Sequence, residues 1–216
     1  MSEIQPAHVK AYWEKVAEQF DTIYSGEKSG FMRFLDKVFR RDMYERYHLT
    51  ISECADPAIK SVLDVGTGSG RFCLPLADQK EKIVGIDFSA PMIELAQRRA
   101  QEAGVADRCD FRVGDFMDMD ISESFDVVIA IGVFDYVSEP ATLLRKMRKQ
   151  AGAKIVTTFP TLWTWRVVPR WIRLKFGGCP VYFFTKDQVR KYHEAAGLTI
   201  KTFKRVGKIY FVVAKP

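Results

Sequence analysis

The sequence has the size and composition of a single globular domain. Of its 216 residues, 47% are hydrophobic and 28% are charged, a balance that excludes an intrinsically disordered chain and suffices for one full-sized core. The net charge of +6 permits an anionic partner such as nucleic acid or an acidic lipid, but it does not require one.

The sequence also argues against membrane, secreted and metal-binding proteins. The longest apolar run, Val127 to Phe134, is far shorter than the roughly 20 residues that span a bilayer. The first ten residues lack the apolar core of a signal peptide, so we expect a cytoplasmic protein. We expect no metal site, because the cysteines and histidines lack the paired spacing of metal ligands. These residues are Cys54, Cys73, Cys109, Cys179, His8, His48 and His193.

Two amphipathic helices are predicted at the start of the chain. Residues 7–20 carry apolar side chains at helical spacing, and residues 30–47 mix aromatic side chains with arginines at the same spacing. We therefore assign residues 1–50 to an N-terminal helical arm and residues 51–216 to the main domain.

From residue 61 onward, predicted strands and helices alternate. The strands are short apolar runs, expected at residues 61–65, 82–87, 109–113, 125–131 and 154–159. The helices are expected at residues 71–78, 91–103 and 140–150. Ser89 is the predicted N-cap of the second of these helices, which Gly104 ends. Strands that alternate with helices in this way form a largely parallel sheet with helices on both faces.

The last part of the chain breaks this alternation. After a helix at residues 185–196, strands at residues 198–205 and 208–214 follow each other, with only Val206 and Gly207 between them. So short a connection predicts a β-hairpin, and one strand of a hairpin must run antiparallel to the other.

A glycine-rich turn follows the first predicted strand. Gly66, Gly68 and Gly70 lack side chains, so the backbone can turn sharply and approach a ligand closely. The N–H groups of the helix expected behind the turn would also face that ligand. A dinucleotide-binding loop of the form G-x-G-x-x-G would need glycine at position 71, where this chain has Arg71, so a pyrophosphate ligand is disfavoured.

Carboxylates at the ends of the first three strands narrow the choice of ligand. Asp87 ends the second strand, where an acidic side chain can accept hydrogen bonds from both hydroxyls of a ribose. Asp115 follows the third strand and can accept from an adenine amino group, with Phe116 beside the ring. Asp64 in the first strand can face an ammonium group. This pattern suits adenosine attached to a cationic amino acid better than a polyphosphate.

Four segments resemble, in order, the successive motifs of class I S-adenosylmethionine-dependent methyltransferases. They are VLDVGTGSG, VGIDFSAPMIELAQRR, FRVGDF and FDVVIAIGVFDYV, which begin at Val62, Val84, Phe111 and Phe125. The sequence is similar to the small-molecule branch that includes ubiquinone-biosynthesis and magnesium-protoporphyrin methyltransferases. In addition, YWEKVAEQFDTIY, from Tyr12 to Tyr24, resembles the N-terminal arm that this branch folds over its cofactor.

The resemblance implies a fold, a cofactor and a set of binding residues. The fold is a Rossmann-like, seven-stranded, mostly parallel sheet with an antiparallel last strand, helices on both faces and an N-terminal helical appendage. The implied cofactor is S-adenosyl-L-methionine, bound within residues 51–216, with S-adenosyl-L-homocysteine as the product. The implied cofactor contacts are Asp64, Gly66, Thr67, Gly68, Gly70, Asp87, Phe88, Met92, Asp115, Phe116, Ile131, Gly132 and Val133.

The catalytic residue stays unassigned. Methyl transfer needs the acceptor and the methyl group to be aligned and kept dry, and it needs a general base only if the acceptor arrives protonated. Many relatives carry a histidine near the end of the fourth strand, where this chain has Phe134, Asp135 and Tyr136. Asp135, Tyr136 and Tyr24 of the arm are the candidates for contact with the acceptor.

A small, hydrophobic metabolite is the expected methyl acceptor. Gly132, Val133 and Phe134 replace the N/D-P-P-Y/F loop of enzymes that methylate the amino groups of bases, and no cysteine nucleophile lies nearby. Nucleic acid is therefore disfavoured as a partner. The alternatives are an RNA methyltransferase, and a cofactor-binding module without transferase activity. The sequence does not predict the oligomeric state.

One aromatic and basic segment, residues 162–176, has three interpretations. Its tryptophans share one helical stripe and its arginines another, and Pro169 should kink the helix. The segment is interpreted as a lid over the acceptor, as a peripheral contact with a membrane surface, or as a helix that packs its tryptophans on the core.

Overall fold

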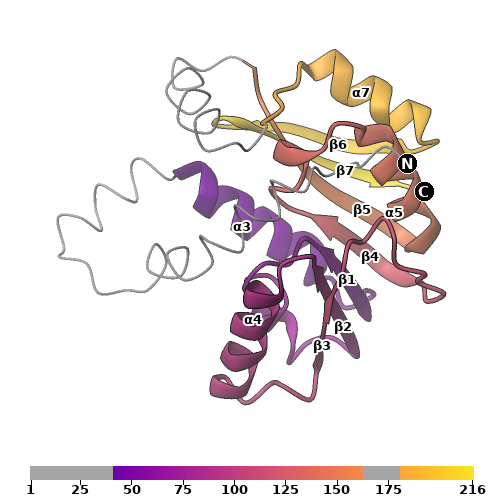
Figure 1. Cartoon of the computed structure of the whole chain (residues 1–216). Helices are drawn as coiled ribbons and strands as arrows, with labels where there is room; N and C mark the ends of the chain where they lie inside the picture. The colour runs from indigo at the N-terminus through magenta and orange to yellow at the C-terminus, as the bar shows by residue number, and fades with distance from the viewer. Residues whose placement is uncertain (1–40, 163–180) are drawn as a thin grey trace, which may run out of the picture.

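The computed structural model describes residues 41–162 and 181–216 (Figure 1). The predicted helix at residues 7–20, the candidate Tyr24 and the first part of the predicted helix at residues 30–47 lie outside the described residues. The same holds for the 162–176 segment apart from Leu162, so its three interpretations stay predictions. The division of the chain at residue 50 also stays a prediction.

Within the described residues, seven strands form one sheet in the order β3-β2-β1-β4-β5-β7-β6 (Figure 1). Strands β1 to β5 are parallel where they pair, and β7 runs antiparallel to both of its neighbours. This confirms the predicted Rossmann-like sheet and its C-terminal hairpin. The strands are β1 (Ser61–Val65), β2 (Lys82–Asp87), β3 (Cys109–Val113), β4 (Phe125–Ala130), β5 (Ala151–Pro160), β6 (Thr199–Val206) and β7 (Ile209–Lys215).

Helices cover both faces of the sheet, as the sequence predicts. Side chains of β1 alternate between the two faces, so that Val62 packs on one side and Leu63 on the other. The Val62 side holds the core under α3 (Arg41–Cys54) and α4 (Ala90–Glu102). The Leu63 side holds the core under α5 (Pro140–Gln150) and α7 (Lys186–Ala195). The sheet is therefore buried between two apolar layers.

Most predicted boundaries agree with the structure to within a residue or two, but the helix predicted at residues 71–78 is wrong. A turn and a 3-10 helix, Leu74–Leu76, occupy this place. Pro75 is the physical reason, because it has no N–H to donate and its ring obstructs the carbonyl four residues earlier. The hydrogen bonds accordingly tighten to a spacing of three residues, from Leu76 N to Cys73 O and from Ala77 N to Leu74 O.

Two further elements extend beyond their predicted ends. Helix α3 continues past residue 47 to Cys54, and Thr50 and Cys54 are both fully buried on its core-facing side. It ends just before Asp56, whose neighbour Pro57 disfavours helical backbone in the residue before it. Strand β5 begins at Ala151 and not at residue 154, because Ala151 already pairs with β4.

No helix in the described parts of the chain is long and apolar enough to cross a membrane.

Candidate functional site

The strand order reverses between β1 and β4, and this reversal locates the candidate site. β1 is followed in the chain by β2 on one side, whereas β4 leads to β5 on the other side (Figure 1). The connections that leave the two strands therefore diverge at the carboxyl edge of the sheet, where open α/β sheets bind their ligands. The segments at this edge are residues 66–70 after β1 and residues 131–136 after β4.

The glycine turn after β1 is held by β2. The N–H groups of Gly66 and Thr67 both donate to the carbonyl of Ile86, at 2.8 and 3.0 Å. Gly66 has a φ of 71°, and a Cβ there would lie 2.5 Å from Cγ2 of Val133, so this position is closed to side chains. Gly68 also has a positive φ, 54°, but no described atom lies within 4 Å of where its Cβ would stand. The turn therefore has an open side at Gly68.

Asp87 lies beside the backbone of Gly68, fixed by two backbone hydrogen bonds. Gly68 N donates to its Oδ2 and Ser89 N to its Oδ1, both at 2.9 Å. Burial raises the pKa of Asp87, and the two N–H donors oppose that shift. Ser89 is the N-cap of α4, as predicted, but among the described residues its hydroxyl makes no capping hydrogen bond. The carboxylate thus ties the glycine turn to the start of α4.

Asp64 lies beneath the glycine turn, with 1% of its surface exposed. Its Oδ2 accepts a hydrogen bond from Oγ1 of Thr67 at 2.9 Å and lies 3.7 Å from the Cys73 thiol. Burial raises the pKa of Asp64 to about 7, although the Thr67 and Cys73 hydrogen bonds work against this. The predicted contact of Asp64 with an ammonium group stays a prediction.

Asp115 and Phe116 begin the loop after β3. Oδ1 of Asp115 accepts from the N–H of Met117 at 2.8 Å, which folds the loop back on itself. The Phe116 side chain is buried in the core on the α5 side. On the neighbouring segment, Phe88 is half-buried beside Asp87, and Met92 is buried in the first turn of α4.

The end of β4 supplies the opposite wall of the candidate site. Ile131 and Val133 are buried, and the N–H of Gly132 donates to Oγ1 of Thr158 at 2.9 Å. A Cβ at Gly132 would lie 3.5 Å from Nη1 of Arg46, so helix α3 brings a guanidinium group to this point. From the sequence alone Arg46 is only one residue of an amphipathic helix, because helical spacing does not reveal which strand end an arginine reaches.

The catalytic candidates Asp135 and Tyr136 follow directly, in the 3-10 helix Phe134–Tyr136. Asp135 is 9% exposed, and its carbonyl accepts from Tyr182 N at 2.8 Å. Tyr136 is partly buried at the same edge. In the described parts of the chain, no three His, Cys, Asp or Glu side chains gather as a metal ion would require.

Comparisons with known proteins agree with this arrangement. A family model described as a methyltransferase domain matches residues 58–166, which is half of the chain. The chain therefore belongs to the methyltransferase-domain family.

Individual relatives include ubiquinone-biosynthesis methyltransferases, which the motifs also resemble. A ubiquinone biosynthesis O-methyltransferase of Azorhizobium caulinodans is 39% identical over 101 residues, which cover 45% of this chain and 39% of that protein. The chain spans between 39% and 56% of the length of such curated relatives.

Solved structures share the fold over nearly the whole chain. Magnesium protoporphyrin IX methyltransferase from Synechocystis PCC 6803, crystallised with bound SAH, has a TM-score of 0.77 at 21% identity and covers 96% of this chain and 97% of its own. A [4+2]-cyclase has a TM-score of 0.73 at 17% identity, with 96% and 94% covered. The same fold thus serves more than one reaction.

Proposed function

We propose that the chain is an S-adenosylmethionine-dependent methyltransferase that acts on a small, hydrophobic metabolite. The carboxylate of Asp87, fixed by the backbone N–H groups of Gly68 and Ser89, is the observation that carries this proposal. Each of its oxygens accepts one backbone N–H and retains a further acceptor position. This arrangement suits the two hydroxyl groups of a ribose.

The turn behind the glycines supports adenosylmethionine over a dinucleotide. Pyrophosphate sites use the free N–H groups and the dipole of a regular α-helix that starts behind the glycine loop. Here Pro75 reduces that helix to the three residues Leu74–Leu76. Because the helix dipole is small and the Asp87 carboxylate would repel a phosphate, the site favours a neutral ribose over a phosphate.

Arg46 is our candidate for the amino-acid end of the cofactor. Its guanidinium lies beside Gly132, on the opposite side of the strand reversal from Asp87. A guanidinium binds carboxylates through paired hydrogen bonds. Arg46 would therefore hold the carboxylate of the cofactor while Asp87 holds its ribose.

S-Adenosylmethionine supplies a methyl group already activated by its sulfonium, so the residues of this chain mainly need to align the acceptor and exclude water. The edge beyond β4 and β5 is aromatic and apolar, with Tyr136, Tyr182 and the 49%-exposed Leu162. This character supports a hydrophobic acceptor. Asp135 and Tyr136 stay our candidates to take a proton from an acceptor that arrives protonated.

A thermodynamic cycle tests the role of Asp87. Calorimetry would measure the binding of S-adenosylhomocysteine and its 2′-deoxy analogue to the wild type and to Asp87→Ala. Since the substitution also removes the contacts to Gly68 and Ser89, weaker binding alone does not identify a ribose contact. We expect loss of the hydroxyl to weaken binding to the wild type by about tenfold or more, and to matter little in Asp87→Ala.

Glu94→Ala, on the exposed face of α4, is the matched control and should behave as the wild type does. If removal of the 2′-hydroxyl from the ligand lowered the affinity of the wild type and of Asp87→Ala by the same factor, the ribose assignment would be contradicted. No binding of S-adenosylhomocysteine by the wild type would contradict the proposed function itself.

A cofactor-binding protein that does not transfer the methyl group is the second candidate, favoured by the likeness to a [4+2]-cyclase. Production of S-adenosylhomocysteine from S-adenosylmethionine, assayed with a panel of hydroxylated aromatic acceptors, separates the two. A transferase forms the product with at least one acceptor, whereas a binding module forms none.

A further inference from the structure

Lys146, in the middle of α5, is bonded to the loop that carries Asp115. Its Nζ donates to the carbonyl of Met117 at 2.8 Å and to that of Met119 at 2.6 Å. The same ammonium lies 5.2 Å from the centre of the Phe116 ring, in the range of a cation–π contact. One side chain therefore contacts three of the four residues that follow Asp115.

The loop closes on Asp115 from the other direction as well. The N–H groups of Asp118 and Met119 both donate to the carbonyl of Asp115 at 3.0 Å. The N–H of Gly114 donates to the carbonyl of Asp87 at 2.9 Å, which links the loop to the proposed ribose site. Lys146 thus completes a compact turn whose first residue is the proposed adenine ligand.

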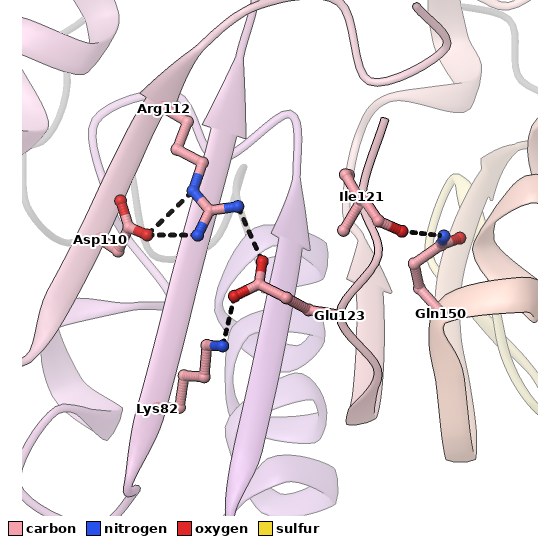
Figure 2. Close-up of polar contacts among 6 residues, drawn as sticks. All are labelled: Lys82, Asp110, Arg112, Ile121, Glu123 and Gln150. Carbon is pink, nitrogen blue, oxygen red and sulfur yellow. Dashed lines mark hydrogen bonds and ion pairs between the residues drawn. The ribbon is translucent and has the colours of Figure 1, made fainter. Parts of the chain in front are cut away.

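Helix α5 holds the next part of the connection in the same manner. Nε2 of Gln150 donates to the carbonyl of Ile121 at 3.0 Å (Figure 2). Lys146 and Gln150 are four residues apart, so they lie on one face of the helix. They bind carbonyls at positions 117, 119 and 121, which alternate along the loop. Lys146 is the member of this pair nearer to Asp115.

Partial burial of the Lys146 ammonium group, whose hydrogen-bond partners are carbonyls, costs free energy of desolvation. Burial lowers the pKa of Lys146, and the carboxylates of Asp115, Asp118 and Asp120 offset part of this cost. A long apolar side chain could fill the same space without desolvating a charge. What an apolar side chain could not do is hold two carbonyls at fixed positions.

We propose that Lys146 is a positioning residue that orders the 115–119 loop so that Asp115 meets the adenine amino group of the cofactor. This inference rests on the proposed function, since it assigns a ligand to the same site. Lys146 itself does not touch the cofactor in this account. It acts by keeping the loop in the conformation that binds adenine.

The test measures discrimination, because a general loss of stability would not change it. Calorimetry would compare S-adenosylhomocysteine with its 6-deamino analogue, which lacks the adenine amino group, on the wild type and on Lys146→Met. We expect the wild type to prefer the amino-bearing ligand by about tenfold, the factor that 1.4 kcal/mol gives, and Lys146→Met to lose most of this preference. Lys146→Arg, which keeps the charge and its donors, should recover part of it.

Two controls separate positioning from folding. Lys149→Met removes an exposed lysine from the same helix and should keep the full preference. Gln150→Met removes the bond to Ile121, so we expect it to lower the Tm yet to keep the preference. Unchanged discrimination in Lys146→Met, with the wild type binding normally, would overturn this inference alone. A wild type that does not bind S-adenosylhomocysteine would overturn the proposed function and this inference with it.

Discussion

At the scale of one residue, Asp64 is a carboxylate whose burial beneath the glycine turn is unfavourable for its charged form. The carboxylate is buried under the turn, where a hydroxyl and a thiol are its hydrogen-bond partners. Its pKa rises to about 7 from an ordinary value of 3.8, chiefly because burial penalises the charged form. The folded state therefore binds a proton at Asp64 more tightly than the unfolded state does. The stability that this proton confers is complete below about pH 4 and is lost as the pH rises to 7.

We predict that Asp64→Asn stabilises the protein at pH 8 relative to the wild type. Asparagine can still accept the hydrogen bond from Thr67, and it carries no charge to desolvate. The advantage should shrink by about 1.4 kcal/mol for each pH unit between 7 and 4, as the wild-type carboxylate takes up its proton. Chemical denaturation of both proteins across this range measures it. An advantage that does not change with pH would contradict the shifted titration of Asp64.

The residues of the candidate site were only partly predictable from the sequence. Asp87 ends one strand and Asp115 follows another, and the apolar pattern reveals both strands, so the place of these carboxylates at the carboxyl edge could be inferred. Arg46 and Lys146 come from helices, and nothing in helical spacing says which loop or strand end a long side chain reaches. The burial of Asp64 beneath the turn depends on how Thr67 folds over it, which the order of residues does not convey.

The ion-pair network beside β2 and β3 is the clearest feature at the scale of secondary-structure elements. Arg112 of β3 bonds to Asp110 and to Glu123, and Glu123 also bonds to Lys82 of β2 (Figure 2). Glu123 belongs to the connection that leads into β4. The network therefore ties the end of that connection to two strands, on the side away from the bond between Gln150 and Ile121.

Glu123→Gln should destabilise the protein at pH 7 by about 1 kcal/mol or less, the range of partly exposed ion pairs. The Arg112 hydrogen bond, followed by the Lys82 one, lowers the pKa of Glu123 to about 2 from its ordinary 4.5. A lowered pKa contributes stability that is present above pH 4.5 and is lost as the pH falls toward 2. The difference between variant and wild type, measured by urea denaturation, should therefore shrink below pH 4.5. Glu94→Gln on α4 is the control, and a difference that persists at pH 2.5 would contradict this assignment.

Strands were easier to predict than helices. The five inner strands of the sheet each carry a short apolar run and pair with neighbours on both sides, so burial leaves a strong signal. The helix expected at residues 71–78 had an apolar pattern of the same quality, but Pro75 removes one hydrogen-bond donor and limits the segment to a 3-10 turn. Pro75 alone therefore prevents the α-helix that the apolar pattern of residues 71–78 predicts.

At the scale of the whole molecule, the order of the strands links these features. The reversal between β1 and β4 places the glycine turn, Asp87 and the 115–119 loop on one side, and Gly132, Arg46, Asp135 and Tyr136 on the other. The alternation of strands and helices, with a hairpin at the end, predicts a largely parallel sheet with one antiparallel strand, but it does not predict the order of the strands. The methyltransferase family was predictable from four short motifs. The acceptor was not predictable, because the edge beyond β4 and β5 where we propose that it binds follows no spacing rule.

The central claim is that S-adenosylmethionine binds across this reversal, and a crystal structure with S-adenosylhomocysteine tests it most directly. We predict that the ribose hydroxyls lie within hydrogen-bond distance of Asp87, the adenine amino group next to Asp115, and the amino-acid end between the glycine turn and Gly132. A ligand bound elsewhere, or one whose ribose does not contact Asp87, would contradict the account.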